Sequence, residues 1–420
     1  MKLDLTDMLY ALSFALDKVE TELLGLDTGH SKHVAYLAML MGQEAGIRDE
    51  ELRDFAGCCI LHDNALTEFI HEELLDQKNV SVDISDMIAG NDKTGINYKH
   101  CIVGEKNVQL MPFRTDVKDI ILYHHENADG TGVLKKTASE IPLKSQILHL
   151  ADIIDMKFRL TSITKEEFEK LRKWVQSQAG ALFSEEATDL FLKAVTYDEI
   201  LHVRENGLFD GLHEKLHKEI LDYPDDEIRN IAGLFAKIVD YKSEFTQYHS
   251  AGVAEKAEIM ARYYNFDAEK TIRFYFAGAM HDIGKLVVSN DILEKPGKLT
   301  VDEFTEMKNH AAATYHVLSQ IKEIPDIVEW AANHHEKLNG NGYPRGLTEK
   351  ELSFEDQLMA CIDIYQALTE KRPYKDGMSH EKTISILMDM AGKGELNEKI
   401  VHDIDVVMAA RQGVKEAVLS

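Results

Sequence analysis

Apolar residues recur at helical spacing along most of this 420-residue chain. Residues 4–24 place apolar side chains every three or four positions, and residues 226–241 repeat the pattern in the second half. Alternating runs of β-branched residues, which favour strands, are scarce. The pattern therefore predicts an all-α protein built of helix bundles. Further segments with helical spacing are 33–46, 50–62, 116–125, 144–159, 251–265, 267–281, 325–335 and 354–369.

Histidines and aspartates recur in the same order in both halves of the chain. Equivalent residues are separated by a nearly constant interval, which indicates two copies of one domain. We expect these copies in residues 1–200 and 225–420, joined by a charged helical connector at 201–224. The recurring residues are His30, His62, Asp63, His100, His124, His125 and Asp152 in the first copy, and His249, His281, Asp282, His310, His334, His335 and Asp363 in the second.

Each set combines imidazole and carboxylate groups on separate predicted helices, which a bundle can direct into one pocket. Such donors, without thiolate, suit iron, manganese, zinc or similar divalent ions. Seven ligands exceed the need of one ion, so the second copy is predicted to hold two metal ions, with Asp282 as their bridge. Two metals generate a hydroxide from a bound water and clamp a phosphate, which suits phosphodiester hydrolysis.

Composition limits the kinds of partner that the protein is expected to bind. The chain has 73 acidic and 47 basic residues, a net charge of −26, which disfavours binding to duplex nucleic acid. Its four cysteines form no CxxC pair and fit a reducing compartment. The first residues are acidic rather than basic, and no stretch has the roughly 20 apolar residues of a membrane span. We therefore expect a cytoplasmic protein that does not enter a membrane.

The second copy resembles the HD-GYP family of the HD metal-dependent phosphohydrolases, bacterial enzymes that act on cyclic di-GMP. The resemblance spans about 225–400 and rests on four motifs: HDIGK at 281–285, KPGKLT at 295–300, HHEKLNGNGYP at 334–344 and IDIYQALTEKRPYK at 362–375. It implies a cyclic dinucleotide substrate, most directly cyclic di-GMP cleaved to linear pGpG or GMP, and two ions of iron or alternatively manganese. It also implies catalytic roles for Asp282 and Lys285, and substrate contacts by Lys285, Tyr343, Arg372 and Lys375.

The sequence departs from that family at several points. Phe245 stands where some members have a glutamate for a third metal, and Glu244 is one position away, so we expect two ions. In the first copy, Leu66 replaces the lysine of HDxGK and Gly132-Val133-Leu134 replaces GYP. That copy is therefore expected to be regulatory or structural, with a candidate second metal site. It could also mediate homo-oligomer formation or bind a signalling partner.

Three functions remain open on the sequence. The first is a phosphodiesterase for cyclic di-GMP or for a related dinucleotide such as cyclic GMP-AMP. The second is another HD nucleotide phosphohydrolase, which the GYP and RPYK segments argue against. The third is a non-catalytic, signal-binding pair of HD domains. Lys285 beside a complete ligand set favours an enzyme, because a binding module has little use for a cation there.

Overall fold

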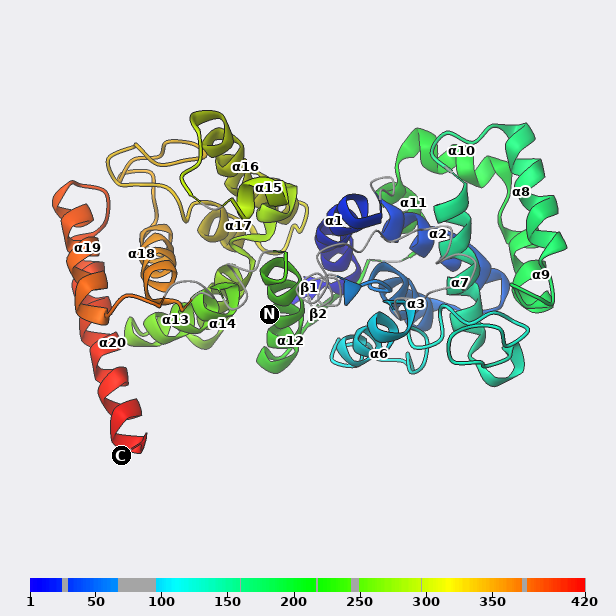
Figure 1. Cartoon of the computed structure of the whole chain (residues 1–420), viewed down its shortest axis with the longest axis horizontal. Coiled ribbons are helices and arrows are strands. Elements are labelled where there is room, and N and C mark those ends of the chain that lie inside the picture. The colour runs from blue at the N-terminus through cyan, green and yellow to red at the C-terminus, as the bar shows by residue number, and fades with distance from the viewer. Residues whose placement is uncertain are drawn as a thin grey trace. The chain divides into compact units, whose positions relative to one another are not determined.

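The computed structural model describes residues 1–24, 29–66, 96–158, 160–216, 218–242, 249–295, 297–371 and 376–419. These residues contain 18 α-helices and one sheet of two short strands, β1 (Lys2–Asp4) and β2 (Ile220–Asp222) (Figure 1). The prediction of an all-α fold is thus confirmed. The chain divides into an N-terminal unit, Asp4–Leu221, and a C-terminal unit, Asp222–Ser420 together with Met1–Leu3. The predicted connector, 201–224, includes α11, β2 and most of α10.

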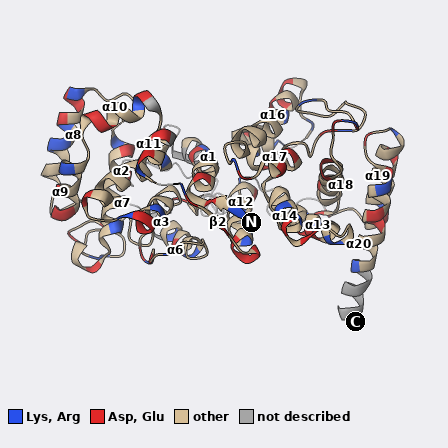
Figure 2. Cartoon of the chain, turned by 180° about the vertical axis from the view of Figure 1, so that it is seen from behind, with Lys and Arg blue, Asp and Glu red and all other residues tan. Residues whose placement is uncertain are grey.

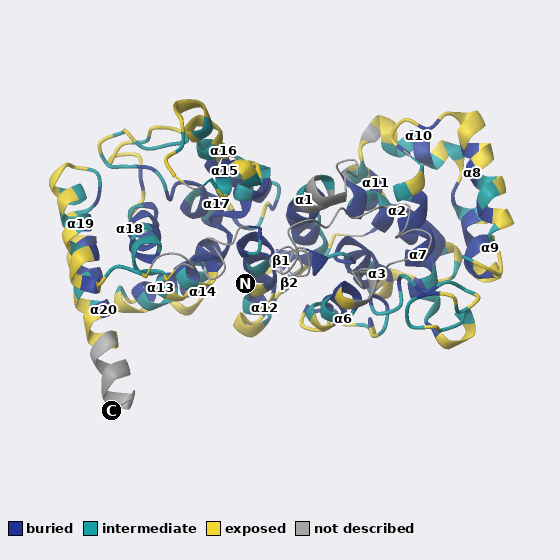
Figure 3. Ribbon diagram, in the orientation of Figure 1, coloured by how far each residue is buried: buried dark blue, intermediate teal, exposed yellow. Residues whose placement is uncertain are grey.

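The N-terminal unit surrounds helix α2, which packs against α1, α3, α7 and α9. All residues from Val34 to Met41 in α2 are buried, because apolar residues occupy every face of this helix. The outer helices α8 and α10 expose much of their surface (Figure 3). The helices of this unit are α1 (Leu5–Leu24), α2 (His30–Glu44), α3 (Asp49–Ile60), α6 (Ile96–Val108), η1 (Ala138–Glu140), α7 (Leu143–Lys157), α8 (Lys165–Ser177), α9 (Glu185–Ala194), α10 (Tyr197–Asn206) and α11 (Leu208–Lys215).

One helix prediction in this unit is wrong. Residues 116–125 form successive turns instead of a helix. The carboxylate of Glu105, in α6, accepts hydrogen bonds from the backbone N–H groups of Asp119, Ile121 and Leu122 at 2.7–3.2 Å. These bonds take the place of helical ones, and Asp119 adopts a positive φ of 64°. The apolar spacing of the segment therefore reflects burial rather than helix.

The C-terminal unit has the same kind of core. Helix α13 packs against α12, α14 and α18, and α16 packs against α17 and the short helix η2. The side chains of Phe274, Phe276 and Met280 in α14 are fully buried. The helices are α12 (Asp225–Asp240), α13 (His249–Tyr263), α14 (Ala268–Met280), η2 (Ile283–Val287), α15 (Asn290–Leu293), α16 (Val301–Leu318), α17 (Pro325–Ala332), α18 (Phe354–Thr369), α19 (His380–Gly392) and α20 (Glu398–Leu419).

Surface charge is mixed over the helices of both units, as α8 illustrates with basic and acidic residues side by side (Figure 2). Within the described ranges, a helix with the length and apolarity needed to cross a bilayer does not occur.

Candidate metal centres

Five elements of the C-terminal unit bring its seven recurring residues together. His249 begins α13, and Asp363 lies on α18, which packs against that helix. The His281–Asp282 pair follows α14, His310 lies on α16, and His334–His335 form the turn after α17. All are buried except His335, which is partly exposed. The helices thus converge on one interior point, as their spacing in the sequence predicts.

Asp282 faces two separate groups of histidines. Its Oδ2 atom lies 3.1 Å from Nε2 of His281 and 3.6 Å from Nε2 of His249. Its Oδ1 atom lies 3.6 Å from Nε2 of His310 and 3.8 Å from Nε2 of His334. The second carboxylate, Asp363, lies 3.0 Å from Nε2 of His249 through Oδ1. One carboxylate therefore stands between two nitrogen clusters, an arrangement that can serve two adjacent cations.

Backbone carbonyls orient the histidine rings. Nδ1 of His281, His310 and His334 lies 2.6–2.7 Å from the carbonyl oxygen three residues earlier, so Nδ1 carries the proton and Nε2 faces the centre. His249 differs, because its Nδ1 lies 3.1 Å from the carboxylate of Glu370. Glu370 is a supporting residue that sequence reasoning missed.

The charge states of most of these groups suit metal binding, with His249 as the exception: burial lowers its pKa, but hydrogen bonds to Asp363 and Glu370 outweigh burial and raise that pKa to about 9. Burial lowers the pKa of His335 to about 3 and that of His334 well below its ordinary range. Burial alone raises the pKa of Asp282, but His281 and Lys285 outweigh it and hold that pKa well below its usual value. Neutral imidazoles and ionised carboxylates are the forms that ligate metals. Among the described residues, Nε2 of His281 and Oδ1 of Asp282 are buried without a well-directed hydrogen bond, which fits an ion there.

Two predicted substrate-contact residues border this centre. The Lys285 ammonium lies 2.5 Å from Oδ2 of Asp282. The ring of Tyr343 lies against that of His335, with centroids 4.7 Å apart and the ring planes tilted by 39°. Arg372 and Lys375, also predicted to contact substrate, lie outside the described residues, as do Phe245 and Glu244.

A glycine sets the approach of the His281–Asp282 turn to α16. A Cβ atom on Gly284 would lie 1.9 Å from the carbonyl oxygen of His310, so only glycine fits. The hydroxyl of Thr314 donates to the carbonyl of His281 at 2.9 Å and accepts from the N–H of Gly284 at 3.1 Å. This contact fixes the spacing between Asp282 and His310. Sequence reasoning noted the glycine only within HDIGK and did not foresee its packing role.

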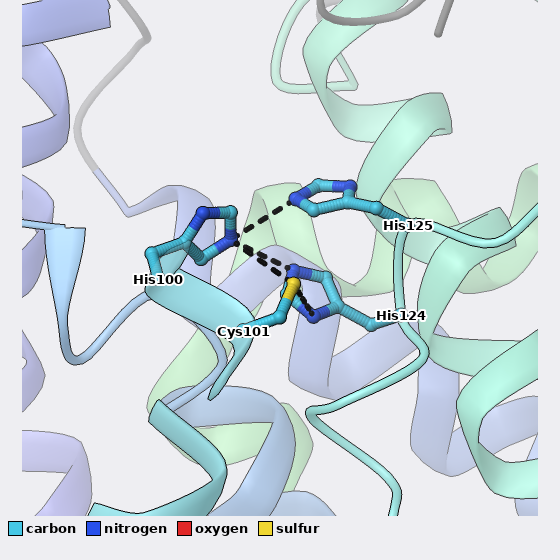
Figure 4. Close-up of side chains that lie close together, drawn as sticks. All are labelled: His100, Cys101, His124 and His125. Atoms are coloured by element: carbon cyan, nitrogen blue, oxygen red, sulfur yellow. Dashed lines mark hydrogen bonds between the residues drawn. The ribbon is translucent and has the colours of Figure 1, made fainter. Parts of the chain in front are cut away.

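The N-terminal unit assembles its own seven residues in a similar way. Nε2 of His30 lies 3.2 Å from Oδ1 of Asp152, and Oδ1 of Asp63 lies 3.4 Å from Nε2 of His100. His100 in turn lies 3.5 Å from Nε2 of His124 (Figure 4). Burial raises the pKa of Asp63, but His62 and the other histidines outweigh it and lower that pKa to about 2.

Supporting contacts in the N-terminal unit are different. Asp155, one turn after Asp152, accepts from Nδ1 of His30 at 2.7 Å and lies 3.3 Å from Nδ1 of His33. Asp155 is a supporting residue that the sequence pattern does not identify. At the position of Lys285 stands Leu66, which is 1% exposed, so the leucine supplies packing in place of a cation.

Comparison with known proteins agrees with this geometry. Residues 28–157 and residues 233–400 each match a family described as HD domain. The chain therefore belongs to the HD-domain family of phosphohydrolases and carries two copies of the domain.

Particular relatives span nearly the whole chain. The 3'3'-cGAMP-specific phosphodiesterase 1 of Vibrio cholerae is 27% identical over 97% of this chain and 92% of its own length. A probable cyclic di-GMP phosphodiesterase of the same organism is 36% identical, but over 38% of this chain and 37% of its own length. A crystal structure of a cyclic GMP-AMP-specific phosphodiesterase from V. cholerae has a TM-score of 0.67 at 22% identity, covering 97% of this chain and 98% of that one. At 22% identity, this similarity supports the fold alone.

Proposed function

We propose that this protein is a metal-dependent phosphodiesterase that hydrolyses a cyclic dinucleotide at the centre of its C-terminal unit. The observation that carries the proposal is the position of Asp282, whose two oxygens face two histidine clusters while Lys285 lies beside it. A cation beside a paired metal centre suits a phosphate oxygen on which negative charge develops.

The residues divide into those that would hold metal and those that would hold substrate. His249, His281 and Asp363 could ligate one ion, and His310, His334 and His335 a second, with Asp282 shared between them. Two divalent ions bound there would supply Lewis acidity toward the phosphate and lower the pKa of a water molecule. Iron is the first candidate and manganese the second, since both accept mixed imidazole and carboxylate ligands.

Lys285 and Tyr343 complete the proposed substrate side. The Lys285 side chain is 20% exposed, so it can contact a bound phosphate while Asp282 holds its position. Tyr343, whose ring packs against that of His335, offers an aromatic face for a nucleobase. We keep Arg372 and Lys375 as further proposed contacts, on the resemblance of the RPYK segment to the HD-GYP pattern.

For the substrate, we place 3'3'-cyclic GMP-AMP ahead of cyclic di-GMP, the substrate that the sequence motifs alone favour. The reason is the share of this chain with which each relative aligns. The relative named for cyclic GMP-AMP aligns with 97% of the chain, whereas the more identical cyclic di-GMP relative aligns with 38%. If both HD domains contribute to the substrate preference, the relative that aligns with both of them is the better guide to the substrate.

The N-terminal unit is proposed to bind metal without hydrolysing substrate. It keeps the seven recurring residues but has Leu66 and Val133-Leu134 where the C-terminal unit has Lys285 and Tyr343-Pro344. Without a cation at that turn, a bound phosphodiester would lack the contact that stabilises developing charge. A structural or regulatory role fits this residue set best.

The experiment is product analysis. The purified chain is incubated anaerobically with Fe(II) or Mn(II) and with cyclic GMP-AMP, cyclic di-GMP or cyclic di-AMP, and products are separated by chromatography. We expect linear or mononucleotide products, fastest from cyclic GMP-AMP, and none after chelation of the metal. Faster cleavage of cyclic di-GMP would overturn the preference alone. Cleavage of none of the three by the metal-loaded chain would overturn the phosphodiesterase proposal and favour a binding module.

A further inference from the structure

The N-terminal unit carries a thiol at its histidine cluster that the C-terminal unit lacks. Cys101 follows His100 on α6, whereas Ala311 follows His310 on α16. The Cys101 sulfur lies 3.6 Å from Nε2 of His100 and 3.5 Å from Nδ1 of His124 (Figure 4). Cys101 is 2% exposed. A cysteine thus lies where the equivalent centre offers nitrogen and oxygen alone.

The spacing of the donor atoms suits a four-coordinate ion. Nε2 of His100 lies 3.1 Å from Nε2 of His125 and 3.5 Å from Nε2 of His124. The donor atoms of these three histidines and Cys101 all lie within 4.8 Å of one another. In a tetrahedral zinc site, bonds of about 2.0–2.1 Å to nitrogen and about 2.3 Å to sulfur place neighbouring donors roughly 3.3–3.6 Å apart. The observed contacts of His100 fall close to that range.

Ring orientation and unsatisfied polar atoms support a bound ion. Nδ1 of His124 lies 2.6 Å from the carbonyl oxygen of Ile121, so Nε2 is the nitrogen left for a ligand bond. Nearby, Nε2 of His62 and Oδ1 of Asp63 are buried and have no well-directed hydrogen bond among the described residues. His62 is 0% exposed. Buried polar atoms are rarely left unsatisfied, so a cation is the natural partner for this pocket.

We infer that the N-terminal unit binds a zinc-class divalent ion through His100, His124, His125 and the thiolate of Cys101. On binding, the Cys101 S–H bond breaks, a metal–sulfur bond forms and the proton passes to solvent. Thiolate with imidazole selects softer ions than the imidazole and carboxylate set of the C-terminal unit. Four protein donors also close the coordination shell, which is the mark of a structural or regulatory site rather than a catalytic one.

Cobalt(II) substitution tests this inference without measuring activity. The full chain is stripped of metal, loaded with Co(II), and its near-ultraviolet spectrum is compared with those of Cys101→Ser and Cys361→Ser. Cys361, two residues before Asp363, is the control for a thiol near the C-terminal centre. We expect a thiolate-to-cobalt charge-transfer band in the wild type and in Cys361→Ser, and its complete loss in Cys101→Ser. A fully loaded wild type without the band would overturn the inference, as would a band that survives in Cys101→Ser.

X-ray absorption on the zinc-loaded wild type makes the test independent of any variant. One sulfur neighbour at about 2.3 Å, with nitrogen or oxygen neighbours at about 2.0–2.1 Å, is expected for zinc in the N-terminal unit. Scattering from nitrogen and oxygen alone would overturn the inference. Neither readout depends on hydrolysis, so failure here leaves the proposed phosphodiesterase function untouched.

Discussion

Replacing Gly284 by alanine should disable the C-terminal centre through packing alone. The added methyl group would lie 1.9 Å from the carbonyl oxygen of His310 and 2.6 Å from the backbone nitrogen of Thr314. Contacts below 3.0 Å essentially never occur, and these atoms are backbone, so rotation of a side chain cannot relieve them. The His281–Asp282 turn and α16 must therefore separate by about 1 Å or more, a strain of the kind produced by overpacking.

The size of the effect follows from that displacement. Overpacking of a buried contact typically lowers the free energy of unfolding by about 1–3 kcal/mol. A shift of about 1 Å between Asp282 and His310 can lower turnover by about 10²-fold, because both residues are proposed ligands of the metal centre that acts on the phosphate. Both quantities are measurable in the metal-loaded protein, by urea unfolding and by initial rates of cyclic dinucleotide cleavage.

The matched control is Gly233→Ala. Gly233 lies on α12 of the same unit, and a Cβ atom there would meet nothing within 4 Å. Because alanine favours helix, this variant should gain about 0.4–1 kcal/mol of stability and keep its turnover. Should Gly284→Ala match the wild type in both stability and rate, the packing argument is wrong. A stability loss without any rate change would refute the link between this contact and the metal centre.

Four further predictions address charge and metal. Lys285→Met should lower turnover by about 10²–10³-fold while the metal content stays constant. A rate equal to that of the wild type would exclude a role of Lys285 at the phosphate. The control is Lys393→Met, which removes an exposed lysine. Glu370→Gln should weaken metal binding by about 10–100-fold in chelator competition, because Nδ1 of His249 loses its carboxylate partner, and unchanged affinity would contradict this. Burial, despite bonds from Ser250, raises the pKa of Asp240 to about 6. The protonated form is thus favoured in the folded state, so this stabilisation is present below the ordinary pKa of 3.8 and is lost as pH rises to about 6. The free energy of unfolding of the wild type, measured with urea, should therefore fall by up to about 3 kcal/mol between these pH values, whereas that of Asp240→Asn should not. An identical pH profile in both proteins would contradict the assignment. Removal of metal by a chelator should lower the melting temperature as well as abolish cleavage, and a melting temperature independent of metal would argue against the buried ligand sets.

Helices were predictable where local signals agree with burial. Helix α18 covers the predicted residues 354–369, because Ser353 and Asp356 form a capping box directly before the apolar run. The failed prediction at 116–125 has a non-local cause, since Glu105 supplies the competing hydrogen bonds from α6. A single sequence does not reveal which distant carboxylate reaches which backbone.

The residues of the candidate metal centres were likewise predictable only in part. The fourteen recurring residues were predictable because the repeat marks them twice, and each set meets at one point. Glu370 and Asp155 carry no such mark, since each supports the first histidine of its own unit from a different position after the aspartate. Cys101 is also unmarked, because its role depends on the direction in which α6 presents it. One position along a helix turns a side chain by about 100°, and only the structure resolves that rotation.

The most direct test of the central claim compares Asp282→Asn with Asp63→Asn. Each change replaces the aspartate of a His-Asp pair with a side chain of the same shape, one in each unit. The quantity measured is the initial rate of cyclic GMP-AMP cleavage by the full chain, with bound metal determined for every sample. We expect at least about 10²-fold loss for Asp282→Asn and a rate close to wild type for Asp63→Asn. Loss of cleavage in Asp63→Asn with Asp282→Asn still active would place the reaction in the other unit and contradict the account.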